Sequence, residues 1–213
     1  MRYRMLLILL AAFFIESAAR DMRSVWKSVP DTVVPGIDRV RRLEMLDLVD
    51  YRVKAEVNNR LGTTSVMDTV TADYLHITLS KSCDMSMRLL PMAEGDTLIC
   101  MLTTFKAPEA ESTICFYDLD WQRMDNASYL PFSRLNEVSD SLVCRPDSMP
   151  VDSFAWLCSQ VVVPLVSARQ TETSSDIMLE ASFPMLSAAV SRKIKAMLVS
   201  RRLVWDSCRY IWQ

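Results

Sequence analysis

The chain shows two hydrophobic periods, one after the other. Between residues 39 and 55, apolar side chains recur every three or four positions, which is the spacing of one face of an α-helix. This stripe consists of Val40, Leu43, Leu46, Val49 and Val53. Asp38 precedes it, and aspartate is a preferred N-cap because its carboxylate accepts bonds from free backbone N–H groups. We therefore predict a helix over residues 39–55, after a shorter one over 21–28.

From residue 64 onward the period changes to two. Residues 73–80 alternate, so that Leu75, Ile77 and Leu79 point to one side of a strand. Further strands are predicted over 64–71, 84–90, 97–105 and 113–119. Strands joined by short turns form an antiparallel sheet with one buried face, and we expect the two helices to cover that face.

The second half repeats this order on a smaller scale. A helix over 151–162 places Val151, Phe154, Cys158 and Val161 on one face. The other predicted elements are strands at 165–171 and 177–183, a helix from its cap Ser187 to Ser200, and a hairpin over 202–206 and 209–212. The fold class is therefore α+β, with helices packed on antiparallel sheet.

The element order divides the chain into four parts. They are a signal peptide over 1–19, a helix–helix–antiparallel sheet subdomain over 20–124, a connection over 125–150, and a smaller α+β subdomain over 151–213. Two sequential subdomains and one domain built from two such layers are both compatible with this order.

The N-terminus has the layout of a secretory signal peptide. Arg2 and Arg4 precede an unbroken apolar run over 5–15, and Ser17 and Ala19 stand at −3 and −1 of a cut before Arg20. The run is shorter than the roughly 20 apolar residues that span a bilayer. The first cysteine, at position 83, is far from the cut, which excludes a lipoprotein anchor. We expect a protein exported to the periplasm or the cell exterior.

Composition removes several classes of function. The formal net charge of −2 becomes −3 without the leader, so no electrostatic attraction to nucleic acid is expected. The three glycines are isolated from one another, whereas phosphate-binding loops need them clustered. The sequence therefore predicts no nucleotide site and no cofactor.

The six cysteines have no CxxC spacing, so neither a zinc site nor a thioredoxin-like site is indicated. Most are expected to be small buried apolar residues. One disulfide is a candidate. If a hairpin pairs 97–105 with 112–119 so that Phe105 faces Ser112, then Cys100 and Cys115 lie diagonally on one face.

His76 and a pair of aspartates are the candidate site residues. His76 is the only histidine and lies on the polar side of its predicted strand, as an exposed strand residue would. Asp118 and Asp120 are two positions apart, so a strand would present both carboxylates on one face about 7 Å apart. Such a pair suits glycosidase-like hydrolysis, and it equally suits two exposed acids near a strand end. We identify no catalytic residue and no metal ligand from the sequence.

Several blocks of the chain resemble one protein family. They are SVPDTVVP (28–35), RRLEMLDLVD (41–50), KAEVNNRLG (54–62), TADYLHITLSKSCDMSMRLLP (71–91), DTLICMLTTF (96–105) and ICFYDLDW (114–121). Their order and spacing are similar to the Bacteroidales-restricted secreted family DUF3256, a domain of unknown function. The resemblance implies a compartment and a host group, and it implies no activity.

With no catalytic constellation in the sequence, we expect a non-enzymatic periplasmic protein that binds another protein or an envelope component. One alternative is a peptide or glycan hydrolase that uses Asp118 and Asp120. Another is a structural component of the envelope. The sequence does not predict the oligomeric state.

Overall fold

The computed structural model describes residues 21–213, and the predicted signal peptide lies outside this range. The first half contains α1 (Met22–Ser28), α2 (Arg39–Asp50), β1 (Ala55–Asn58), β2 (Thr64–Val70), β3 (Tyr74–Ser80), β4 (Cys83–Pro91), β5 (Thr97–Phe105), β6 (Glu111–Tyr117) and β7 (Arg123–Met124). The second half contains the 3-10 helices η1 (Asn126–Ser128) and η2 (Leu135–Leu142), then α3 (Val151–Ser159), β8 (Leu165–Thr171), β9 (Ser174–Ser182), α4 (Ala188–Lys195), β10 (Arg201–Trp205) and β11 (Tyr210–Trp212).

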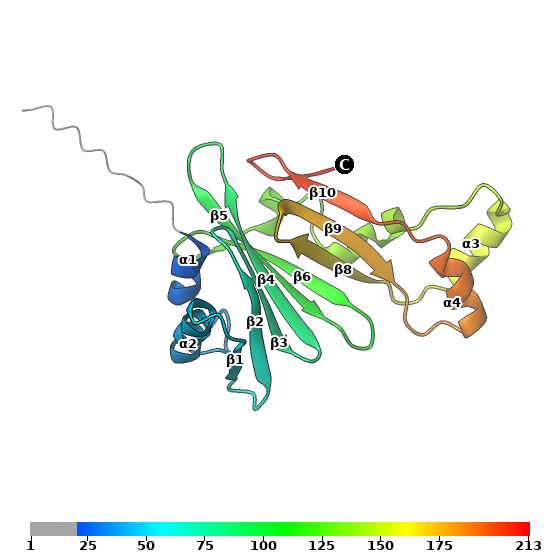
Figure 1. Ribbon diagram of the computed structural model, residues 1–213. Helices are drawn as coiled ribbons and strands as arrows, with labels where there is room; N and C mark the ends of the chain where they lie inside the picture. Colours follow the sequence, from blue (N-terminus) through cyan, green and yellow to red (C-terminus); the bar gives the residue numbers. More distant parts are fainter. Residues whose placement is uncertain (1–20) are drawn as a thin grey trace, which may run out of the picture.

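Three layers make up most of the molecule (Figure 1). The large sheet has the order β1-β2-β3-β4-β5-β6-β7, and every neighbouring pair is antiparallel. The small antiparallel sheet has the order β11-β10-β9-β8. Helices α1 and α2 lie on one side of the large sheet and the small sheet lies on the other. The predicted α+β class, with helices packed on antiparallel sheet, is confirmed.

The large sheet is buried on both faces, whereas the sequence pattern predicted burial of one. On the helix side, Leu75, Met87 and Met101 are neighbours across β3, β4 and β5 and share a core with Trp26 of α1. The predicted cover by the helices is therefore present. The small sheet covers the second face, and this explains the six consecutive buried residues in β4, Met85 to Leu90. Strands covered on both sides do not alternate between buried and exposed residues.

The other face forms a second core with the small sheet. Cys100, Leu102 and Phe116 from the large sheet share this core with Ile177 and Leu203. The predicted connection over 125–150 also takes part, since it contains η1 and η2 and buries three apolar side chains there: Leu130, Val138 and Leu142.

The β5–β6 hairpin differs by one residue from the predicted register. Phe105 pairs with Glu111 rather than Ser112, so Cys100 faces Phe116 and Cys115 faces Met101. Because side chains alternate along a strand, this shift places Cys100 and Cys115 on opposite faces of the sheet. Both are free cysteines. The shared face on which the candidate disulfide depended does not exist in this register.

Helix α2 is capped as predicted but buries a different stripe. Asp38 accepts a bond from the backbone N–H of Arg41 at 3.0 Å. The fully buried residues are Arg42, Met45 and Leu46, whereas Val40 is 73% exposed. The guanidinium of Arg42 enters the core edge because it donates to the carbonyl of Ile37 at 2.6 Å and pairs with Asp31 at 2.9 Å. These hydrogen bonds allow a charged residue to occupy a buried position on α2, on a face that the hydrophobic pattern did not predict to be buried.

Candidate functional site

His76 lies on the polar side of β3, as the alternation predicts, and its neighbour there is Asp68. Its Nδ1 is 3.0 Å from Asp68 Oδ2, and the same oxygen accepts bonds from the backbone N–H and the hydroxyl of Thr78. A carboxylate oxygen only accepts, so Nδ1 is the donor of this hydrogen bond. Asp68 was missed because it lies at a bulge between β2 and β3, which no two-residue period reveals.

A cleft of about 400 Å³, lined by both polar and apolar side chains, lies beside His76, where β8 crosses the large sheet. One wall carries the ion pair of Lys106 and Asp84, whose atoms are 2.8 Å apart. The other wall carries Arg169 and Glu180 from the small sheet, both exposed. We call this the inter-sheet cleft.

The floor of the inter-sheet cleft is a neutral hydrogen-bonded network that joins the two sheets. Ser86 donates to the side-chain carbonyl of Gln170 at 3.2 Å, and the Gln170 amide donates to Cys100 Sγ at 3.3 Å. Burial raises the pKa of Cys100 to about 12 and also raises the pKa of Tyr210 well above its usual value. Both groups are therefore neutral at pH 7.

The edge of β8 along this cleft is closed to a further strand. The Ala168 N–H donates to Ser112 Oγ at 2.9 Å, and the Tyr74 hydroxyl donates to the Gln170 carbonyl. Arg88, which is buried and stacks 4.6 Å from the Tyr74 ring, donates to the Thr171 carbonyl. Edge backbone groups that are already bonded cannot template another chain.

The two aspartates lie elsewhere, in the turn after β6 and not on a strand. β6 ends at Tyr117, and Asp118 Oδ1 accepts bonds from the backbone N–H groups of Asp120 (2.9 Å) and Gln122 (2.8 Å). The predicted extension of the strand to residue 119 was wrong because this turn begins at Asp118. Across the sheet, the turn lies three strands away from His76. Along the strand direction, the turn begins four residues, or about 13 Å, beyond the β6 residue that lies level with His76. The structure does not bring the aspartates to the histidine.

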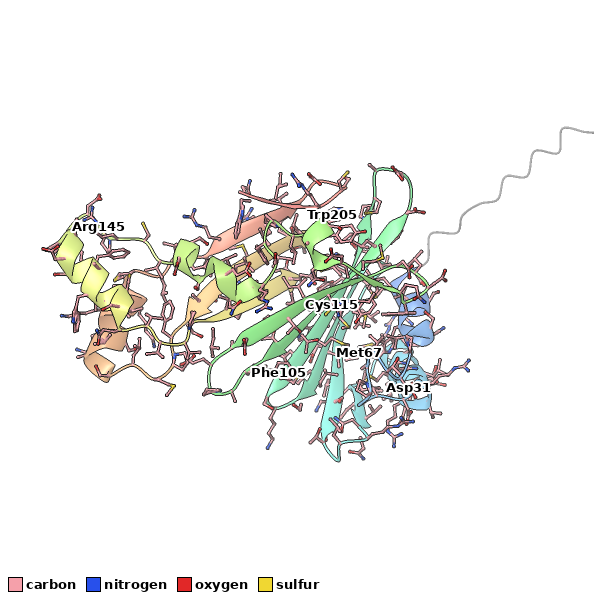
Figure 2. The ribbon with its side chains drawn as sticks, turned by 180° about the vertical axis from the view of Figure 1, so that it is seen from behind. Asp31, Met67, Phe105, Cys115, Arg145 and Trp205 are labelled. Atoms are coloured by element: carbon pink, nitrogen blue, oxygen red, sulfur yellow. The ribbon has the colours of Figure 1, made fainter. Side chains whose placement is uncertain are left out.

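A protruding lobe at the far end of the molecule has a different surface. We define the α3–α4 lobe as residues 144–164 and 183–200; it projects beyond the sheets in Figure 1, and Arg145 marks its outer part in Figure 2. Helix α3 fully buries only Leu157. Trp156 is 51% exposed, Val162 81% and Met185 88%.

The charge of the lobe is opposite in sign to that of the chain. Its basic residues are Arg145, Arg192, Lys193 and Lys195, and its acidic residues are Asp147 and Asp152. This is a net charge of +2 in a sequence whose total is −2.

Ser187 caps α4 as predicted, and the helix ends at Lys195 rather than continuing to Ser200.

An apolar hollow of about 350 Å³ lies on the inner side of the lobe, between α3, α4 and η2. Phe154, Cys158 and Val161, three members of the predicted apolar face of α3, line it. Val151, the fourth, is exposed. The helical period was therefore correct, but the face borders a hollow instead of a packed core. Burial, and then the nearby Asp140 carboxylate, raise the pKa of the Cys158 thiol, so it stays protonated at neutral pH.

Metal sites and membrane spans are both missing from the described range. In residues 21–213, His, Cys, Asp and Glu side chains do not gather in threes that could hold a metal ion. Within the same range, none of the helices has the length and apolar character needed to cross a bilayer.

Comparisons with known proteins place the chain in a family. It is similar in structure to a domain of an uncharacterized protein from Porphyromonas gingivalis W83, with a TM-score of 0.71 and 18% sequence identity over 90% of this chain and 96% of that one. The search of the curated proteins found no match. The family model described as "Protein of unknown function (DUF3256)" matches residues 14–210. The chain therefore belongs to the DUF3256 family.

Proposed function

We propose that this protein is a non-enzymatic exported protein that binds another protein or an envelope component through the α3–α4 lobe. The observation that carries the proposal is the exposure of apolar side chains on α3 and its flanks. A helix of nine residues that fully buries one side chain gains little from its own packing, and exposed apolar residues gathered on one part of a surface are typical of interaction sites.

The rest of the molecule supports this assignment by contrast. In the inter-sheet cleft, four of the polar lining groups are already paired, in the Lys106–Asp84 ion pair and the Ser86–Gln170 hydrogen bond. The alternative of hydrolysis by Asp118 and Asp120 gains no support from geometry, because Asp118 Oδ1 holds a turn together.

A crosslinking pull-down from the native host tests the proposal. Trp156→Ser removes a large exposed side chain of the lobe, and Tyr51→Ser, at a residue 79% exposed beside α2, is the matched control. We expect a specific partner that is recovered with the wild type and with Tyr51→Ser but is lost with Trp156→Ser. Recovery of nothing above background from intact envelope, or equal recovery with both variants, would contradict the proposal.

A further inference from the structure

The surface of the α3–α4 lobe combines exposed apolar side chains with a stretch that lacks charge. Residues 153–168 contain no charged side chain. Trp156 of α3 and Val162 just after it are exposed within this stretch, and Met185 is exposed in the loop that precedes α4. The apolar surface of the lobe is therefore supplied by three separate segments of the chain.

Cations that have no acidic partner lie next to this apolar surface. Arg145 and the α4 residues Arg192, Lys193 and Lys195 are all exposed, and among residues 21–213 none of the four forms an ion pair. Lys193 and Trp156 line the same open hollow between α3 and α4, so an ammonium group and an indole ring share one part of the surface. The lobe thus presents positive charge beside an exposed aromatic side chain.

The distribution of charge favours an extended anionic surface as the partner. The lobe carries +2 and the rest of the sequence therefore carries −4, so such a surface attracts the lobe and repels the body. The lobe also projects beyond the sheets, which lets it touch a broad surface while the body stays clear of it (Figure 1). A bilayer interface accepts apolar side chains from separate segments, whereas a protein interface requires close packing around a central apolar patch.

From these observations we infer that the α3–α4 lobe attaches the protein to the surface of an anionic phospholipid bilayer. Trp156 lies at the level of the headgroups, where tryptophan is enriched, and the α4 cations face the lipid phosphates. Attachment of this kind adds buried apolar area to electrostatic attraction and needs no spanning segment. The inference rests on the proposed function, for which it names the envelope component.

Cosedimentation with phospholipid vesicles tests the inference. The chain from residue 20 onward is used, because it keeps all the described residues and lacks the apolar run over 5–15, which would itself enter a bilayer. Vesicles of phosphatidylglycerol and phosphatidylcholine in equal parts should bind at least tenfold more tightly than vesicles of phosphatidylcholine alone, and added salt should reduce the difference. Equal binding to the two kinds of vesicle would overturn the inference.

Paired charge variants test whether the lobe is the contact. Lys193→Gln with Lys195→Gln should weaken binding to the anionic vesicles by roughly 25-fold, at about fivefold for each cation near the surface. Arg39→Gln with Arg52→Gln is the matched control, since it removes two exposed cations at α2 and just beyond it, and it should leave binding unchanged. Equal losses in the two double variants would indicate attraction by overall charge and would overturn the inference.

Truncation of the exposed indole separates this inference from the proposed function. Trp156→Ser should weaken vesicle binding by about tenfold, because a large apolar side chain no longer leaves water, and Tyr51→Ser should not. Unchanged vesicle binding in both Trp156→Ser and the lysine double variant would overturn the inference. If the wild type shows no preference for anionic vesicles while the pull-down loses a protein partner with Trp156→Ser, the inference falls and the proposed function stands.

Discussion

The three-layered body contains two large apolar cores, although Val40 and Tyr51 at α2 are exposed, whereas the α3–α4 lobe has one small core. In the body, Phe116, Ile77 and Met87 are completely buried, and both faces of the large sheet are covered. In the lobe, Trp156 and Val162 are exposed, and the apolar face of α3 borders a hollow. The contrast indicates that stability is concentrated in the body, whereas the lobe is left with surface available for binding.

Deleting the small sheet or, separately, helix α3 should show the largest difference in stability between the body and the lobe. A chain that ends at residue 150 lacks the small sheet and exposes Phe116, Leu102 and their neighbours, so we expect no cooperative unfolding transition and extensive aggregation. Replacing residues 145–163 by a short flexible linker removes α3 and should leave a cooperative transition. Urea unfolding followed by circular dichroism distinguishes the two.

A cooperative transition in the chain that ends at 150 would contradict the importance of the second core. It would also support the prediction that residues 20–124 fold as a separate subdomain.

Truncating single side chains should show the same difference in stability between the body and the lobe, with smaller losses. Phe116→Ala creates a cavity in the second core and should lower the free energy of unfolding by about 3–5 kcal/mol. Trp156→Ala should lower it by less than about 1 kcal/mol, because half of that side chain is already in water. Denaturant titration of the two variants measures both, and similar losses would mean that the lobe is as tightly packed as the body.

The sequence predicted the order and type of most elements because their periods are strong. Residues 165–171 form β8 as predicted, and Asp38 and Ser187 cap their helices. The second covered face was not predictable from residues 73–80, since Tyr74 and His76 look like solvent-facing residues. The neighbours of Tyr74, Arg88 and Gln170, come from β4 and β8, and only the packing of one sheet on the other brings them together.

The candidate site was less predictable for a related reason. The helical period of α3 marked Phe154, Cys158 and Val161 correctly, yet period alone does not tell a packed core from a hollow. Likewise, the spacing of Asp118 and Asp120 suggested a strand, and the turn that Asp118 closes follows from backbone bonds that the sequence does not display.

Cys100 in the body and Cys158 in the lobe should differ in their reactivity toward a thiol reagent. Burial raises the pKa of Cys100 to about 12, so in the native protein at pH 8 iodoacetamide should modify Cys158 and leave Cys100 unmodified. The raised folded-state pKa also means that this group stabilises the fold below its unfolded pKa of about 8.5. That contribution is lost as the pH rises toward 12.

Mass mapping after labelling and a stability series from pH 8 to 11 check both statements, with Cys100→Ala as the control that lacks the alkaline loss attributed to this thiol. Rapid labelling of Cys100 in folded protein would contradict its burial between the two sheets.

The smallest expected effect concerns the cap of α2. The backbone N–H of Arg41, and then the Arg41 charge, lower the pKa of Asp38. A lowered folded-state pKa gives stability above the unfolded value of about 3.9, and this is lost as the pH falls through the folded value. Asp38→Asn keeps the cap and should weaken this part of the acid dependence, whereas Asp38→Ala should lower stability at neutral pH too. Thermal melts from pH 2.5 to 7 resolve the three proteins, and identical acid profiles would show that the Asp38 charge is irrelevant.

Hydrogen exchange of backbone amides tests most directly whether the lobe is energetically separate from the body. Amides of α3 should exchange through local opening, at free energies well below that of global unfolding, while amides in β4 and β5 should exchange only when the whole molecule unfolds. If α3 without ligand is protected as strongly as β4, the lobe is an integral part of the core and is not the separate binding element proposed for it.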